Sequence, residues 1–225
     1  MSLEANLALI KERIKRSCIK SNRNQNDVKI IAVTKYVDVD QTKEVLDLGL
    51  EHLGENRVQN ALPKYEKLQG RGFWHFIGRL QSKKVKQILG KFDYIHSLDR
   101  LSLAEEIDKR AKQLGIKVKC FVQVNISKEE TKTGVEPENL LDFIKEVSKF
   151  DSIQLVGLMT MAPYVEDKEL TRPIFRKLRE LLEQINDQNI LDYKLTELSM
   201  GMSNDFEVAI EEGATFIRIG SLLLK

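Results

Sequence analysis

Apolar runs of strand length recur along the chain, separated by segments long enough to hold a helix. The first run, VKIIAVTK at 28–35, is rich in β-branched residues, which favour extended backbone. Later runs are equally short and are bounded by polar or glycine-containing segments. The seven later runs lie at 51–56, 73–78, 94–99, 119–125, 154–160, 194–200 and 215–220.

The segments between these runs have the periodicity of helices. Segment 137–150 places four leucine, isoleucine and valine residues on one face, behind a proline that suits the first turn of a helix. The predicted helices cover 3–22, 39–48, a segment that begins after Asp99 as its N-cap, 137–150 and 169–185.

This alternation predicts the fold. Strands that alternate with helices pair in parallel through right-handed crossovers. Eight such units close a (β/α)8 barrel, the TIM-barrel fold, whereas a doubly wound open sheet usually has fewer strands. We therefore expect an α/β protein with one barrel domain over 1–225 and an extra N-terminal helix.

In such a barrel the chemistry lies at the carboxyl ends of the strands. Lysine is usually held at the surface because burial of its charge is costly, yet the first predicted strand ends at Thr34 and Lys35. Polar residues also stand at or near the ends of other strands. They include Glu55, Asn56, His75, Arg79, Asn125, Thr160, Ser199 and Arg218.

Two glycine–serine segments follow the seventh and eighth predicted strands. The loops after these strands often bind a phosphate through main-chain N–H groups. Either segment alone is more typical of an ordinary turn, but two at adjacent strand ends put a shared phosphate site on equal terms with two ordinary turns. The candidate residues are Ser199, Met200, Gly201 and Ser203, with Gly220 and Ser221.

Lys35 follows the strand that neighbours this predicted site. A partly desolvated lysine amine loses affinity for its proton, and the neutral amine forms Schiff bases with aldehydes. Pyridoxal 5′-phosphate is the common cofactor that carries both an aldehyde and a phosphate. Two alternatives stay open: Lys35 extends its amine to solvent, or the barrel binds a phosphorylated sugar and Lys35 is structural.

Composition narrows the classes of partner. The 36 Lys and Arg residues nearly balance the 34 Asp and Glu residues, so there is no basic surface typical of nucleic-acid or membrane binding. No apolar stretch approaches the length of a membrane span. Cys18 and Cys120 lie far apart without metal-ligand spacing, which predicts reduced thiols and no metal site. We expect a cytoplasmic protein.

Six segments resemble the pyridoxal-phosphate homeostasis proteins, single-domain relatives of the alanine racemase barrel. The most specific is LSMGMSNDFEVAIEEGATFIRIGS at 198–221, which spans the last two predicted strands. The resemblance covers essentially the whole chain and implies one barrel that binds pyridoxal 5′-phosphate. The other segments are AVTKY at 32–36, LGENRVQ at 53–59, WHFIGRLQSKK at 74–84, VQVNISKEETKTG at 122–134 and GLMTMAP at 157–163.

The resemblance also implies residue roles. Lys35 matches the lysine that holds the cofactor as a Schiff base, and Arg218 matches the arginine that faces the pyridine nitrogen. A guanidinium cannot accept a proton at neutral pH, so the ring would stay a weak electron sink. The remaining matches are Ser199, Gly201, Gly220 and Ser221 in the phosphate cup, Met200 and Ser203 in the same loop, Asn56 near the ring, and His75 and Met159 at the mouth.

The family resemblance points to a monomer that buffers the cofactor and delivers it to apoenzymes. A weak racemase that uses Lys35 as a base on one face is the alternative. Racemisation needs a base on each face, and Tyr164 is the nearest candidate for the second. Two departures from the family stand out: Arg79 replaces the usual histidine or asparagine, and the final SLLLK replaces the family's Thr and aromatic–glycine pair. The second departure is expected either to expose Leu222–Leu224 or to alter how the last segment of the barrel closes.

Overall fold

The computed structural model describes residues 2–127 and 133–225, so residues 128–132 of the segment 122–134 lie outside it. Its strands are all parallel and close into a barrel in chain order. The closed (β/α)8 barrel is therefore confirmed, and the open sheet is wrong. The strands are β1 Lys29–Val33, β2 His52–Glu55, β3 Phe73–Phe76, β4 Tyr94–Leu98, β5 Val118–Gln123, β6 Ile153–Met159, β7 Glu197–Met202 and β8 Phe216–Ile219.

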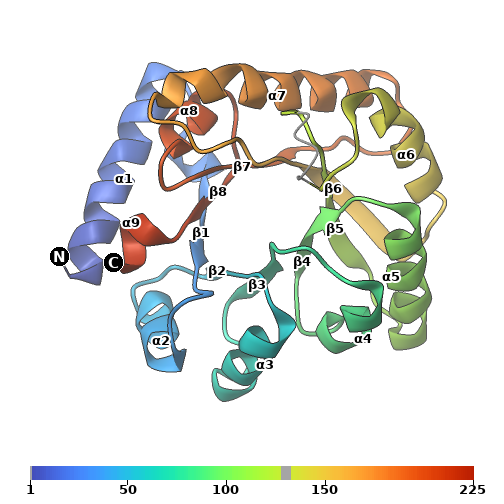
Figure 1. The fold of residues 1–225 in the computed structure, drawn as a ribbon, viewed down its shortest axis with the longest axis horizontal. Coiled ribbons are helices and arrows are strands. Elements are labelled where there is room, and N and C mark those ends of the chain that lie inside the picture. The colour runs from blue at the N-terminus through green and yellow to red at the C-terminus, as the bar shows by residue number, and fades with distance from the viewer. Residues whose placement is uncertain (1, 128–132) are drawn as a thin grey trace.

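Helices surround the barrel (Figure 1). In this view α2, α3 and α4 lie below the strands, α5 and α6 to the right, α7 and α8 above, and the additional N-terminal helix α1 to the left. The α-helices are α1 Leu3–Lys20, α2 Val39–Asp47, α3 Val58–Lys67, α4 Val85–Ile88, α5 Leu101–Leu114, α6 Leu140–Val147, α7 Arg172–Asp187, α8 Phe206–Glu211 and α9 Ser221–Leu224. The 3-10 helices are η1 Gln25–Asp27, η2 Ser82–Lys84, η3 Pro137–Asn139 and η4 Lys168–Thr171.

Side chains alternate between two cores, as the two-residue period of a strand requires. A small cluster of Ile31, Phe121, Met159 and Phe216 fills the barrel interior. The neighbouring strand positions, such as Ala32, pack outward into the larger cluster that joins the strands to the helices. The chain thus has an inner and an outer hydrophobic core, and the polar rim lies where the strands end.

Element boundaries differ from the sequence prediction where polar groups compete with the backbone. Asp99 is not the N-cap of α5, because its carboxylate accepts a hydrogen bond from the Arg100 guanidinium and the helix begins after Arg100. Strand β7 begins later than predicted and continues through Met202, since its pairing with β8 extends as far as Met202 opposite Arg218. Residues 199–202 therefore belong to a strand.

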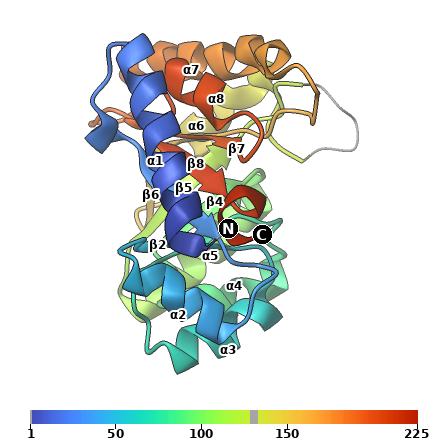
Figure 2. The same ribbon diagram turned by 90° about the vertical axis from the view of Figure 1, so that its left-hand side faces the viewer.

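The two ends of the chain meet at α1. Figures 1 and 2 both show the N- and C-termini side by side. The Asn6 amide donates a hydrogen bond to the Leu223 carbonyl at 3.1 Å, and Arg13 pairs with Glu207 of α8. Leu223 is fully buried and Leu222 and Leu224 are half-buried, so the expected exposure of this segment is wrong.

Two observations bear on the predicted cellular setting. No helix in the described ranges is both long and apolar enough to cross a membrane. Cys18 and Cys120 are both buried as free thiols. Both thiols are therefore shielded from reagents in the solvent.

Candidate functional site

Lys35 lies at the rim of the barrel. It is placed in a turn directly after β1, which the Val37 N–H closes by donating to the Thr34 carbonyl at 3.1 Å. The expectation that Lys35 ends the strand is therefore wrong by two residues. Its side chain is half-buried, with Nζ 4.9 Å from the ring centroid of the exposed Tyr36. The amine is partly shielded and still reachable from solvent.

Strand register brings other predicted residues to both sides of Lys35. Ala32 pairs with Ile219 of β8, and Val33 pairs with Gly54 of β2. The chain segments that follow these pairs are Gly220–Ser221 on one side and Asn56 on the other. Parallel strands end at the same rim, so Lys35 stands between the two.

A buried ion pair lies beneath the Lys35 turn. Lys64 of α3 donates to the Glu55 carboxylate at 2.8 Å and to the Thr34 carbonyl at 2.6 Å. The Thr34 hydroxyl donates to the same Glu55 oxygen at 2.7 Å. All three residues are buried, with Glu55 completely so. This triad ties the end of β1 to β2 and α3, and thus fixes where the Lys35 turn begins.

The predicted phosphate segments meet at Ser203. Its hydroxyl oxygen accepts hydrogen bonds from the Gly220 N–H at 3.2 Å and the Leu222 N–H at 3.4 Å. These main-chain donors lie at the start of α9 and face an oxygen atom. Ser221 is exposed beside them. A phosphate oxygen offers the same acceptor chemistry, so this pair of segments suits a phosphate group.

Packing explains the residue types at positions 200 and 201. Gly201 has a φ of +89°, and a Cβ there would lie 2.6 Å from the Ala209 Cβ of α8. The glycine thus lets α8 approach β7, and an alanine would be strained as well as crowded. Met200 is fully buried in the outer core. Only the main chain of these two residues is left to face a ligand.

Ser199 and Arg218 meet inside the barrel rather than in the open loop. Arg218 donates to the Ser199 hydroxyl at 2.7 Å and to the Thr160 carbonyl at 2.9 Å. Both side chains are buried. Burial lowers the pKa of Arg218 to about 10, opposed by the charge of Asp205, so the guanidinium stays protonated at neutral pH. Burial also raises the pKa of Asp205.

His75 and Met159 do not line an open mouth. Both are buried in the barrel interior, where His75 Nδ1 contacts His96 Nε2 at 2.8 Å. Sequence reasoning missed His96, which also contacts Ser199, and the Glu55–Lys64 pair. A usable signal was present: the chain's three histidines fall in three consecutive predicted strands.

The residues at the rim suit a phosphorylated aldehyde. Lys35 supplies an amine, the Gly220 and Leu222 N–H groups with Ser203 supply an anion cradle, and Arg218 supplies a buried cation. Tyr164, the candidate second base, is 82% exposed, so packing does not hold its ring at the mouth. The arrangement provides binding groups at one rim and one nucleophile.

Comparison with known proteins shows the family of this chain. Residues 2–225 match the family model described as alanine racemase, N-terminal domain. A pyridoxal phosphate homeostasis protein from Aquifex aeolicus is 48% identical over 218 residues, which cover 96% of this chain and 95% of the relative. The chain belongs to the pyridoxal phosphate homeostasis protein family.

Solved structures extend the comparison. PipY of Synechococcus elongatus, described with PLP bound, is 35% identical with a TM-score of 0.83, and the match covers 96% of this chain and all of that one. Alanine racemase of Clostridium difficile is 18% identical with a TM-score of 0.77 over 98% of this chain and 56% of the racemase. The racemase shares the fold. Members of the homeostasis family match this chain along nearly its whole length.

The buried pair beneath Lys35 gives a stability prediction. Lys64→Met leaves the fully buried Glu55 carboxylate without its cation, which should lower the free energy of unfolding by about 3–5 kcal/mol. Urea denaturation followed by circular dichroism measures the loss. Lys67→Met, an exposed position on the same helix, is the matched control and should change stability by about 0.5 kcal/mol or less. Equal losses in the two variants would show that the pair does not hold this turn.

Proposed function

We propose that this protein binds pyridoxal 5′-phosphate at the barrel rim, holds it as a Schiff base on Lys35, and buffers and delivers it to enzymes that need it. One observation carries the proposal. Lys35 stands between the Gly220–Ser221 segment and Asn56, beside main-chain donors that face an oxygen atom. The amine matches the aldehyde of this cofactor, and the anion cradle at the same rim matches its phosphate.

The comparisons support the same function. The Aquifex relative carries the name pyridoxal phosphate homeostasis protein, and PipY is described with PLP bound. In this proposal Ser199 moves from the phosphate cup to the ring nitrogen, because its hydroxyl contacts Arg218. Lys35 bonds the aldehyde carbon, Ser203 and the segment 220–222 hold the phosphate, Ser199 and Arg218 face the ring nitrogen, and Asn56 lies at the ring edge.

The site also suits release more than turnover. Lys35 lies half-exposed in a turn, so the bond to the cofactor stays open to water and to competing amines. In the proposed site the Arg218 guanidinium faces the pyridine nitrogen of the cofactor. A guanidinium, unlike a carboxylate, does not keep that nitrogen protonated. These features support a carrier over an amino-acid racemase.

The Schiff base predicts a spectroscopic loss. Lys35→Ala should abolish the visible absorbance of the loaded protein and its trapping by borohydride. Mass spectrometry of the reduced wild-type protein should find the modification on the peptide that contains Lys35. Lys43→Ala, an exposed lysine on the neighbouring α2, should leave both signals unchanged. Equal absorbance and trapping in Lys35→Ala would contradict the assignment.

The phosphate cup predicts selective loss of affinity. Ser203→Ala removes a hydroxyl that would donate to the phosphate, so the Kd for pyridoxal 5′-phosphate should rise about tenfold. The Kd for pyridoxal, which lacks the phosphate, should change much less. Absorbance titrations of the wild-type protein and of Ser203→Ala with both aldehydes measure the difference. A parallel rise for the two aldehydes would place the phosphate elsewhere.

Delivery predicts direct transfer to an acceptor. The loaded protein is mixed with an aminotransferase stripped of its cofactor, in the presence of an excess of a scavenger that removes free pyridoxal 5′-phosphate. Recovery of aminotransferase activity should persist in the scavenger, whereas free cofactor at the same concentration should fail to restore it. If the scavenger blocks both alike, the protein buffers the cofactor without delivering it.

A further inference from the structure

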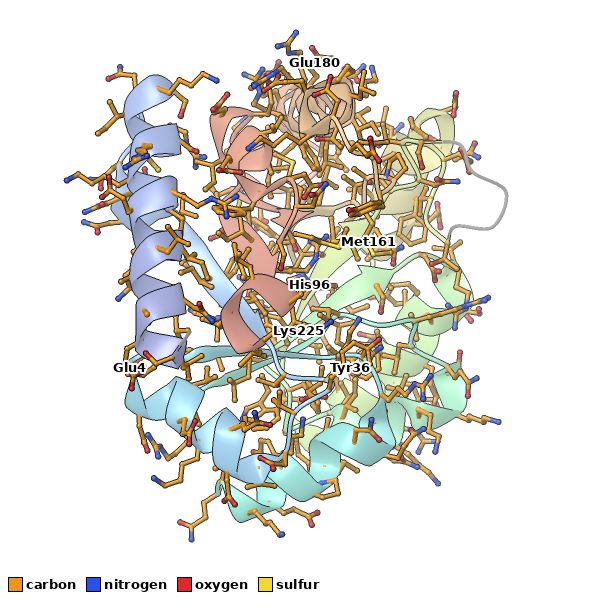
Figure 3. The ribbon with its side chains drawn as sticks, turned by 60° about the vertical axis from the view of Figure 1, so that its left-hand side comes forward. Glu4, Tyr36, His96, Met161, Glu180 and Lys225 are labelled. Atoms are coloured by element: carbon orange, nitrogen blue, oxygen red, sulfur yellow. The ribbon has the colours of Figure 1, made fainter. Side chains whose placement is uncertain are left out.

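The chain's three histidines form one hydrogen-bonded series across the barrel interior. His52 Nδ1 lies 2.9 Å from His75 Nε2, and His75 Nδ1 lies 2.8 Å from His96 Nε2. His96 Nδ1 then lies 2.9 Å from the Ser199 hydroxyl. His75 and His96 are completely buried, and Figure 3 shows His96 at the centre of the molecule. The series runs from β2 to β7 and ends at the hydroxyl that Arg218 contacts.

This arrangement is not a metal site. Both ring nitrogens of His75 and of His96 are already engaged within the series, so their lone pairs do not converge on one point. Across residues 2–127 and 133–225, no group of three or more histidine, cysteine, aspartate or glutamate side chains could hold a metal ion. The geometry is that of a relay or a scaffold.

The three rings are neutral at physiological pH. Burial lowers the pKa of His52 to about 4, and the pKa values of His75 and His96 well below their usual value. Nearby cations act in the same direction: Lys29 on His52 and His75, and Arg218 on His96. Glu197 opposes this effect at His52 only.

The walls around the rings are aromatic. His52 stacks on Phe73, His75 on Tyr94 and His96 on Phe121, with centroid separations of 5.0, 4.5 and 4.2 Å. The Lys119 ammonium lies over the Tyr94 ring, and the Lys29 ammonium lies over the Phe216 ring. The residues that stack on His75 and His96 carry no carboxylate, so they do not favour protonation of either ring.

A neutral imidazole has one donor and one acceptor, so the whole series must run in one direction. Ser199 decides which. The Arg218 guanidinium can only donate, so the Ser199 oxygen accepts from it. The proton of the Ser199 hydroxyl then needs an acceptor, and in the described part of the chain the one at hand is His96 Nδ1.

The direction fixes every proton in the series. His96 accepts at Nδ1, so it carries its proton on Nε2 and donates to His75 Nδ1. His75 likewise donates from Nε2 to His52 Nδ1. In each ring the electron-rich nitrogen faces the Arg218 side and the N–H faces away. No carboxylate in the described residues forms an ion pair with Arg218.

We propose that His52, His75 and His96 are positioning residues for Arg218. Their aligned rings present the acceptor ends of three dipoles toward the buried guanidinium and make Ser199 an acceptor for it. Half-exposed His52, beside Glu197 and Lys29, closes the far end of the series. The last step rests on the proposed function: by holding Arg218 in place, the series sets how firmly the cofactor ring is held.

The tautomers test the proposal without any variant or cofactor. Long-range nitrogen–proton NMR of the 15N-labelled protein should show all three histidines protonated on Nε2 and neutral at pH 7. The His75 and His96 signals should not change between pH 7 and 5, while His52 should titrate near pH 4. A proton on Nδ1 of His75 or His96 would overturn the assigned direction. This result is independent of whether the protein binds pyridoxal 5′-phosphate.

Two serine variants test the link to Arg218. Ser199→Ala removes the donor to His96, so the His96 ring should lose its single tautomer and the Arg218 side-chain NMR signals should shift. Ser97→Ala is the matched control, because Ser97 is equally buried on β4, next to His96 in sequence, and stands outside the series. It should leave both sets of signals unchanged. Unchanged His96 and Arg218 signals in Ser199→Ala would overturn the proposal.

A conservative pair tests the effect on the cofactor. His75→Met removes the hydrogen bond between His75 and His96 and leaves the contacts His96–Ser199 and Ser199–Arg218 in place. The Kd for pyridoxal 5′-phosphate should rise several-fold. His75→Gln keeps one acceptor and one donor and should recover much of the lost affinity. Equal losses in the two variants would mean that His75 acts through packing alone. Failure of the wild-type protein to bind the cofactor would instead reject the proposed function and leave the NMR result standing.

Discussion

Closure of parallel strands into one barrel is the constraint on which the rest of this structure depends. It brings the carboxyl end of every strand to one rim, so Lys35 and Asn56 become neighbours of the Gly220–Ser221 segment, from which most of the chain separates them. It also leaves a narrow interior that the inner core of Ile31, Phe121, Met159 and Phe216 fills only in part. Polar side chains occupy the remaining positions, and the ion pairs and hydrogen bonds that they form shape the site.

The buried charges of Glu55 and Arg218 near the rim are compensated in different ways. Lys64 and Glu55 form a direct ion pair that also binds the Thr34 carbonyl. Arg218 has no such partner in the described residues and relies on a hydroxyl and a carbonyl. A buried cation without an ion pair is costly, and besides the charge of Asp205 the proposed line of oriented imidazoles behind Ser199 compensates it. The ion pair fixes where the Lys35 turn begins, and in the proposal the histidines hold Arg218 in place.

This division of tasks agrees with a carrier of an aldehyde cofactor. In the proposed site, rigid elements hold the groups assigned to the phosphate and to the ring nitrogen, while Lys35 lies on a half-exposed turn. A rigid cradle gives affinity, and an accessible bond allows exchange. The alanine racemase shares the fold, while in the described part of this chain Tyr164, the candidate second base, is exposed and not held in place by packing.

The sequence by itself determined the barrel, its strand order and most of the rim residues. Strand and helix periods depend on local burial, and strand ends must face one rim once the barrel closes. Exact boundaries were beyond it, because Asp99 pairs with the neighbouring Arg100 instead of capping the helix, and residues 199–202 pair with a strand distant in the chain. Only the tertiary structure decided that Ser199 points to Arg218, that Met200 faces the outer core and that three histidines stand in series. Those contacts join strands β2, β3, β4, β7 and β8 across the interior, and no local pattern encodes which side chains meet there.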